Sequence, residues 1–449
     1  MKSLGIRFLS RTVVAVTLLY CAGNAAAQES APPTPQTVRL TLQDALARAR
    51  KNSVPFQAAQ TDAALARQER YQAAAALLPG VNYNTEALYT QSNGPGNGVR
   101  YIANNSVHEY VSQGNVHEVL DLASVSSFRR SSALAAAARA RAEIASRGLV
   151  VTVVQNYFAV AAAQQKLQSA QKTAEEGERF LKLTQDLEQG GEVAYSDVIK
   201  AELQMQERHR QLKEAQLGLL NARLDLAVLV FPDFNDNYEV ADDLHAPAPL
   251  PTLAEVQQQA AKDNPEVRAA LAAVRAAGAE VTSSRAGYLP SLSLDYWYGI
   301  DAPQFAGNTV INGQRFSNLG SAAAATLNIP IWNWGATQSR VKQSELRRAQ
   351  AQRELSLAQR KLLAEIKSLY SESETALNEL GGLSRSAELA AESLRLTTLR
   401  YTNGEATVLE VVDAQTTFAQ ASSAYQDGAV RYHVSLANLQ TLTGVLTTP

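Results

Sequence analysis

The sequence predicts a mainly α-helical protein that also contributes strands to a β-barrel, with the whole plan present twice along the chain. Three observations support this fold class. The 449-residue chain matches itself at a shift of 211 positions. Two stretches of about 65 residues carry helical patterning without a proline. Two strand-like segments precede each of these long stretches, and 46% hydrophobic residues supply material for a large core.

The N-terminal residues 1–27 have the pattern of a secretory signal peptide. A short apolar region at residues 13–20 precedes the small residues Ala25, Ala26 and Ala27, after which we expect the mature chain to begin at Gln28. The segment contains three basic residues and no acidic one, so its removal changes the formal net charge from -2 to -5; they are Lys2, Arg7 and Arg11. This mildly acidic chain has no basic patch for nucleic acid.

The one cysteine, Cys21, lies within the signal. Bulky Tyr20 precedes it, whereas a lipoprotein cleavage site requires a small residue there, so we expect no lipidation. The mature chain then has neither a disulfide nor thiol chemistry.

The duplication pairs whole segments of the chain. At a shift of 211, Leu78-Pro79 matches Leu289-Pro290, and at a shift of 213, Gly191-Glu192 matches Gly404-Glu405. We therefore divide the mature chain into repeats at 28–246 and 247–449, which form one intertwined structural unit.

Each repeat begins with a short helix, a kink at Pro55 or Pro265, and an Ala-rich helix that stops at Pro79 or Pro290. The period then changes from helical to alternating, which predicts one strand after each proline and a returning strand at 107–122 and 319–331. Gly/Asn/Pro-rich loops at 91–98 and 301–314 connect the strands of each pair.

The longest predicted helices cover residues 124–188 and 336–401. The second carries an apolar stripe at helical spacing: Leu355, Leu362, Ile366, Leu369, Leu377 and Leu380. Such helices reach roughly 100 Å. A Gly-containing turn and a returning helix end each repeat, and residues 231–251 form a connecting loop packed alongside the helices.

Four strands that face lipid cannot close a barrel, because unpaired backbone groups are costly in hydrocarbon. Two chains would supply eight strands, whose interior side chains nearly fill, whereas three chains would supply twelve and leave a conduit. The long helices continue from these strands, so we expect them to extend the tube as a ring of coiled-coil pairs.

With these features in order, the mature sequence resembles the TolC-type outer-membrane factor family. The resemblance rests on the duplication, the Leu-Pro junctions, the segment "IPIWNWG" at residues 329–335 and the two Gly-turn tips. It implies a homotrimer with a twelve-stranded outer-membrane barrel and a coiled-coil tunnel across the periplasm. It also implies a periplasmic adaptor and an inner-membrane transporter as partners in efflux or type I secretion. The first repeat departs from the pattern, with "VLDLASVSSF" at the junction.

The resemblance assigns roles to the tips. The adaptor-contacting residues would be Gly190, Gly191, Val193, Ala194, Gly404 and Ala406. Small residues permit close backbone approach, although a helix turn requires glycine in any case. Tyr401 and Asp197 match positions that hold the tips shut, and Ala406 replaces an arginine of that tip latch.

Two carboxylates follow the second tip. Thr407 and Glu410 have the spacing of a capping box, which by itself accounts for Glu410. Asp413 lies beyond the first helical turn and needs another explanation. We interpret Asp413 mainly, and Glu410 partly, as an acidic ring at the periplasmic entrance; the alternative is a solvated charge on an outer helix face.

Other functions find less support. The histidines are scattered, and the two "HE" motifs lack the second histidine of a zinc site, so we expect surface histidines in strands or loops and no metal. The glycine loop lacks the strand-turn-helix setting of a nucleotide site. We therefore expect no enzyme and no cofactor. Trp332 and Trp334 fit an interfacial aromatic belt or packing better than a ligand platform. A periplasmic coiled-coil scaffold or adaptor remains the alternative, but it would have no use for lipid-patterned hairpins.

Overall fold

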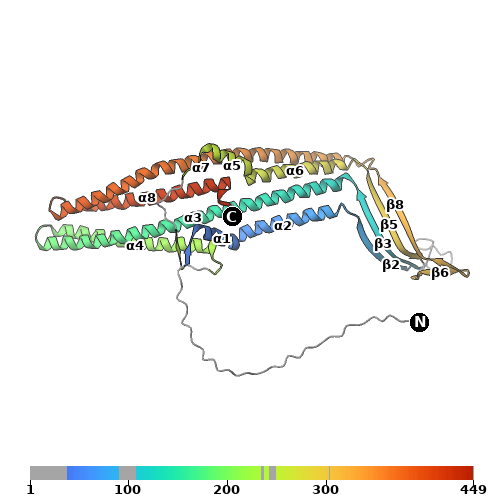
Figure 1. Cartoon of the computed structure of the whole chain (residues 1–449), viewed down its shortest axis with the longest axis horizontal. Coiled ribbons are helices and arrows are strands. Elements are labelled where there is room, and N and C mark those ends of the chain that lie inside the picture. Colours follow the sequence, from blue (N-terminus) through green and yellow to red (C-terminus); the bar gives the residue numbers. More distant parts are fainter. Residues whose placement is uncertain (1–37, 90–107, 234–236, 242–248, 303, 448–449) are drawn as a thin grey trace, which may run out of the picture.

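The computed structural model describes residues 38–89, 108–233, 237–241, 249–302 and 304–447. In these ranges the chain is a long helical bundle with a four-stranded sheet at one end and two helix-turn tips at the other (Figure 1). The predicted signal peptide and the loop at 91–98 lie outside the described residues, as does the predicted repeat boundary after residue 246.

The elements of the two repeats follow the same order. The first repeat contains α1 (Leu42–Asn52), α2 (Val54–Ala75), β2 (Gly80–Tyr89), β3 (His108–Leu120), α3 (Leu122–Gln189) and α4 (Tyr195–Val230). The second contains α5 (Leu253–Asp263), α6 (Pro265–Ala286), β5 (Ser291–Ala302), β8 (Leu319–Asn328), α7 (Ala336–Thr402) and α8 (Val408–Thr443), followed by the short helix η1 (Val445–Thr447). Matching helices are nearly equal in length: 11 residues in α1 and α5, 22 in α2 and α6, and 36 in α4 and α8.

Capping residues explain the breaks between the short helices. The Ser53 hydroxyl accepts from the backbone N–H of Phe56, and Asn264 likewise accepts from Val267 at the start of α6. Pro55 and Pro265 lie in the first turn after these caps, where a missing N–H costs nothing. The chain therefore breaks and restarts at the predicted kinks.

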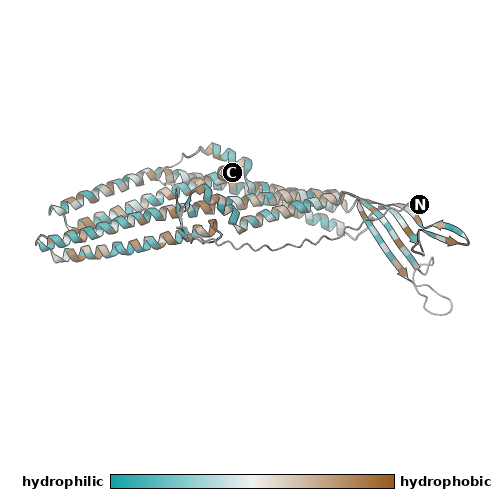
Figure 2. Cartoon of the chain, turned by 60° about the horizontal axis from the view of Figure 1, so that its bottom comes forward, coloured by the Kyte–Doolittle hydropathy of each residue, from teal (hydrophilic) through white to brown (hydrophobic). Residues whose placement is uncertain are grey.

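The four-stranded sheet is antiparallel in the order β2-β3-β5-β8. Its register places Gly80 opposite His117, Leu120 opposite Leu292, and Ser291 opposite Asn328. Both outer strands, β2 and β8, pair on one side only within the described sheet, and every residue of β8 is exposed. Apolar and polar residues are interspersed along the strands and helices (Figure 2).

The region between β5 and β8 corrects one prediction. Residues 301–314 were expected to be a loop, but β5 extends to Ala302, and β6 (Asn308–Ile311) pairs with β7 (Gln314–Ser317). Asn312 and Gly313 turn this hairpin with φ of 53° and 79°. An Asn-Gly pair favours this two-residue turn because both positions require positive φ.

The connecting segment also contains a strand that the sequence analysis did not predict. Residues 238–240 form β4 (Tyr238–Val240), which pairs in parallel with β1 (Val38–Leu40). The strand packs alongside the helices, because Tyr238 is buried and its hydroxyl donates to the carbonyl of Arg223 at 2.7 Å.

The main core lies where α3 is covered by α1, α4 and α8. Its centre is a run of fully buried α3 side chains that includes Val150, Val153, Val154 and Tyr157. Among the described helices, α3 alone is long and apolar enough to pass a composition test for a membrane span. Half of that apolar window is buried inside the chain, where it forms part of the main core.

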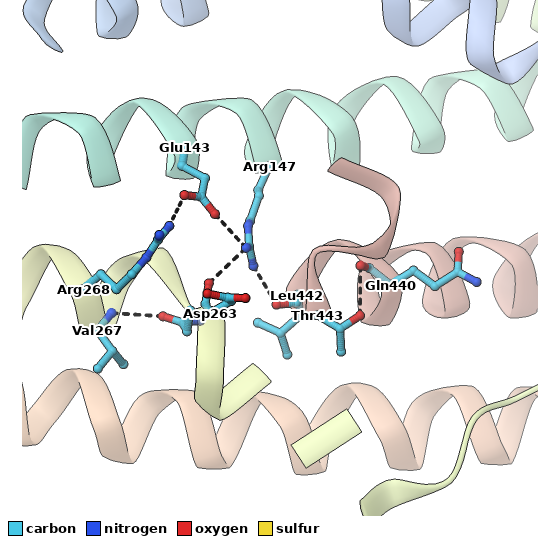
Figure 3. Close-up of polar contacts among 9 residues, drawn as sticks. Glu143, Arg147, Asp263, Val267, Arg268, Gln440, Leu442 and Thr443 are labelled. Carbon is cyan, nitrogen blue, oxygen red and sulfur yellow. Dashed lines mark hydrogen bonds and ion pairs between the residues drawn. The ribbon is translucent and has the colours of Figure 1, made fainter. Parts of the chain in front are cut away.

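A buried arginine on α3 contacts residues of the second repeat (Figure 3). Arg147 on α3 is 9% exposed and donates to the carbonyl of Leu442 at 2.7 Å, near the end of α8, and to that of Asp263 at 3.1 Å. It also pairs with Glu143 at 2.8 Å, which in turn pairs with Arg268. Burial lowers the pKa of Arg147, and the nearby Asp263 opposes this shift. These contacts occupy carbonyls that helix ends leave without partners.

Candidate functional site at the helix-turn tips

The two tips have the same backbone geometry. Gly191 and Gly404 adopt φ of 76° and 74°, a left-handed conformation that only glycine takes at little cost. Just beyond them, the N–H of Glu192 donates to the carbonyl of Leu187, and the N–H of Glu405 donates to that of Arg400, both at 2.9 Å. These bonds close a helix end in the manner of a Schellman motif.

The helices that leave the tips start differently. At α8, the Thr407 hydroxyl accepts from the N–H of Glu410 at 3.4 Å, and the Glu410 carboxylate accepts from the N–H of Thr407 at 3.1 Å. This is the predicted capping box. At α4 the capping position is Ala194, which has no side-chain acceptor, so the start of α4 has no side-chain cap.

Arg400 strengthens the second tip further. Its guanidinium donates to the carbonyl of Glu405 at 3.0 Å and lies 3.5 Å from the carboxylate of Glu410. The pKa of Glu410 is lowered first by the hydrogen bond from the Thr407 backbone, then by the Thr407 hydroxyl and by Arg400. The Glu410 charge is therefore already engaged within its own chain.

An apolar cluster holds the two tips together. It consists of Phe180, Ala201, Tyr401, Val408 and Val411. Tyr401 is 3% exposed, and its ring centroid lies 5.3 Å from that of Phe180 on the other repeat. Its hydroxyl donates to the buried Thr184 at 3.4 Å. Tyr401 thus joins helices that are more than two hundred residues apart in sequence.

The residues predicted for the tip latch have other partners within the chain. Tyr401 bonds to Thr184, while the Asp197 carboxylate pairs with Lys200 at 3.2 Å on the same helix. The latch therefore stays a prediction.

The predicted acidic residues lie side by side at the start of α8. Glu410 and Asp413 are both exposed, whereas Val411, Ala414 and Gln415 of the same helix are buried. Among the ion pairs of the described residues Asp413 has none, in contrast to Glu410 with Arg400. Of these two carboxylates, Asp413 is therefore the one without an ion-pair partner in the described part of the chain.

The predicted adaptor-contacting residues form the outer surface of the tips. Gly190, Gly191, Ala194 and Gly404 are exposed, and Val193 and Ala406 are half-buried against the apolar cluster. No atom lies within 4 Å of where a Cβ would stand at Gly191 or Gly404. A partner helix could approach the backbone closely there.

The other sequence candidates lie elsewhere. His209 and His433 belong to helices rather than to strands or loops, which corrects that expectation: His209 pairs with Glu178 at 2.9 Å, and His433 stacks on Phe158. The described part of the chain holds no group of three metal-ligating side chains. Trp332 and Trp334 contact each other edge-to-face and are 75% and 89% exposed, so they do not pack into the chain.

The sequence analysis missed two residues of the tips. Arg400 lies in the last turn of the long helix, and an arginine ten residues before the capping glutamate is a local signal that could have identified the contact. Thr184 gave no signal, because its contact with Tyr401 depends on how two distant helices pack.

The sequence profile of the outer membrane efflux protein family matches residues 45–230 and 256–445. TolC of Vibrio cholerae is 24% identical over 304 residues, which cover 67% of this chain and 68% of that protein. The alkaline protease secretion protein AprF of Pseudomonas aeruginosa is 23% identical over 425 residues, or 91% and 85% of the two chains.

Solved structures show the same fold. The CmeC outer membrane channel of Campylobacter jejuni superposes with a TM-score of 0.78 at 18% identity and covers 90% of this chain and 85% of its own. The open state of the MtrE channel of Neisseria gonorrhoeae superposes with a TM-score of 0.73 at 22% identity, with coverages of 90% and 88%.

Proposed function

This chain belongs to the outer membrane efflux protein family, whose members are outer-membrane export channels, and we propose that it acts as a homotrimer whose helices form a tunnel across the periplasm. One observation carries the assembly: both outer strands of the sheet, β2 and β8, present unpaired backbone groups over ten residues each in the described sheet. Such edges are not tolerated in lipid. Three copies would join them into twelve strands.

The exposed surfaces support the same assembly. Tyr83, Tyr296, Tyr298 and Leu327 of the sheet are about half or more exposed in the single chain, as the outer face of a barrel in lipid requires. Trp332 and Trp334 follow the last strand and fit an aromatic girdle at the membrane interface. Residues 1–27 would direct the chain to this destination and then be removed.

The tips supply the partner surface. With about 68 residues in α3, the tunnel extends roughly 100 Å from the barrel. We propose that the exposed tips meet a periplasmic adaptor, which connects the channel to an inner-membrane transporter. The channel then conducts its cargo passively and performs no enzymatic reaction.

Membrane fractionation and native mass measurement test the assembly. We expect the protein in the outer-membrane fraction, with a mass of three chains after mild extraction. A soluble monomer would contradict the proposal and favour the periplasmic scaffold.

Substitution at Ala406 tests docking. Ala406 is a cleaner position than Gly404, because a side chain at Gly404 also strains the turn at φ 74°. We expect Ala406→Trp to abolish export while the trimer remains in the membrane. Normal export by this variant, at a normal level of trimer, would remove Ala406 from the adaptor surface.

We further propose that Asp413, with a smaller contribution from Glu410, makes the periplasmic entrance cation-preferring. Three chains would bring six carboxylates to one opening, and such a ring concentrates cations.

A further inference from the structure

A cavity lies between the two repeats close to the tips, on the side toward the sheet. It has a volume of about 500 Å³ and lies between α3, α7 and α8. Its walls are mainly apolar: Phe180, Leu183, Ala391, Leu394 and Phe418. Small-molecule sites in proteins have this size and this character, with a few polar groups that fix orientation.

One buried polar group in the wall has no partner. Gln415 is 8% exposed, and its carboxamide oxygen Oε1 accepts no hydrogen bond from any described residue. Leaving a buried acceptor without a donor destabilises the folded protein, so a ligand that supplies the donor gains affinity. The last torsion of a glutamine is broad, so the amide can turn its oxygen toward a donor that enters the cavity.

The charged side chains at the rim of the cavity differ in whether they have a charged partner nearby. Arg395 is neutralised by Glu392 at 2.7 Å, and Glu176 lies within electrostatic range of the buried Arg208. Arg179 is exposed, and its one hydrogen bond in the described chain runs from Nε to the carbonyl of Glu175. The Arg179 guanidinium therefore remains available for an anion.

We propose that this cavity binds a small organic anion that has an apolar body and an N–H or O–H donor. The apolar body lies against Phe180, Leu394 and Phe418, the donor bonds to Gln415, and the anionic group lies at Arg179. Asp413 is not part of this site, because it is exposed where Gln415 of the same helix is buried.

The probe 8-anilinonaphthalene-1-sulfonate matches this description, since it has an aromatic body, one N–H and one sulfonate. We would titrate it into the full-length protein in lipid nanodiscs and subtract the fluorescence of empty discs. The expected result is saturable binding of one probe per chain. Fluorescence no greater than that of empty discs would overturn the proposal, since the cavity is then inaccessible or covered by another copy.

Three substitutions test the contacts. Ala391 is exposed and small, so Ala391→Trp fills the cavity without disturbing the core and should abolish saturable binding. Gln415→Met should weaken binding roughly 5–10-fold through the lost hydrogen bond. Arg179→Gln should weaken it roughly 2–5-fold, as for an exposed ion pair. Ser386→Trp, at an exposed position on α7 outside the cavity lining, is the matched control and should bind as the parent does.

A thermal melt separates a ligand contact from a structural role of Gln415. Removing an unsatisfied buried oxygen should leave the melting temperature unchanged or raise it, while probe affinity falls. A lower melting temperature for Gln415→Met, or parental affinity in either Ala391→Trp or Gln415→Met, would overturn the assignment. The readout is ligand binding by the purified protein, so the result does not depend on export.

Discussion

The two tips share one backbone and differ in what stabilises it. Both place a glycine at positive φ and close the helix end with matching hydrogen bonds that lie 213 residues apart in sequence. The second tip adds a capping box and two contacts from Arg400. The first tip has Ala194 at the cap and Leu187 where the second has Arg400. The two repeats therefore share the geometry of the turn but differ in the contacts that stabilise it.

The two tips are therefore stabilised by different kinds of contact. The first tip relies on apolar packing against the second, with Leu187 and Val193 beside the shared cluster. The second tip is stabilised by its own polar contacts, which use the Glu410 carboxylate, whereas Asp413 has no ion pair among the described residues. The second tip thus has more polar contacts of its own than the first.

The largest expected effect comes from breaking the contact between the tips. Tyr401→Ala removes a buried ring and should reduce the free energy of local opening by about 3–5 kcal/mol. Hydrogen exchange at both tips should accelerate, and more at the first tip, which depends on this packing.

Tyr401→Phe is the matched control for that change. It removes only the long hydrogen bond to Thr184, so the free energy of local opening, measured by hydrogen exchange, should change by less than about 1 kcal/mol. Exchange in Tyr401→Ala equal to that of the parent would show that the tips are not joined through this ring.

A smaller effect is expected from exchanging the caps. Thr407→Ala should destabilise the start of α8 by about 1 kcal/mol, and Ala194→Thr should stabilise the start of α4 by up to a similar amount. Exchange of the first-turn amides of each helix measures both changes. Equal exchange in parent and variants would mean that capping does not distinguish the tips.

The smallest effect is a dependence on pH at the second tip. Because hydrogen bonds from Thr407 and the charge of Arg400 lower the pKa of Glu410, its ionised form stabilises the folded helix start. This contribution is complete above the ordinary pKa of about 4.3 and is lost as the pH falls through the lowered value. After correction for intrinsic rates, exchange at the start of α8 should accelerate below about pH 4. Glu410→Gln should remove this dependence; if it persists in that variant, another group is responsible.

Most of the fold could be predicted from the sequence because its signals are local or repeated. The prolines and caps fixed the short helices, and the long helices begin and end within two residues of the predicted bounds. The parallel pair β1 and β4 could not be predicted, because three residues carry too little pattern to indicate a strand. The hairpin of β6 and β7 was missed although Asn312-Gly313 is a recognised turn signal.

The candidate site could be predicted only in part. The turn glycines and the capping box are visible within a few residues of sequence, and the structure contains both. The burial of Tyr401, its contact with Thr184 and the unpaired oxygen of Gln415 depend on how α3 packs against α7 and α8. No local pattern records such packing between repeats.

The acidic entrance is tested most directly by single-channel recording in planar bilayers with a multivalent cation on the periplasmic side. Asp427→Asn, farther along α8 at a carboxylate paired with Lys166, is the matched control and should retain the parental block. We predict that Asp413→Asn loses most of the block and that Asp413→Asn combined with Glu410→Gln loses nearly all of it. A double variant blocked as strongly as the parent would contradict the account.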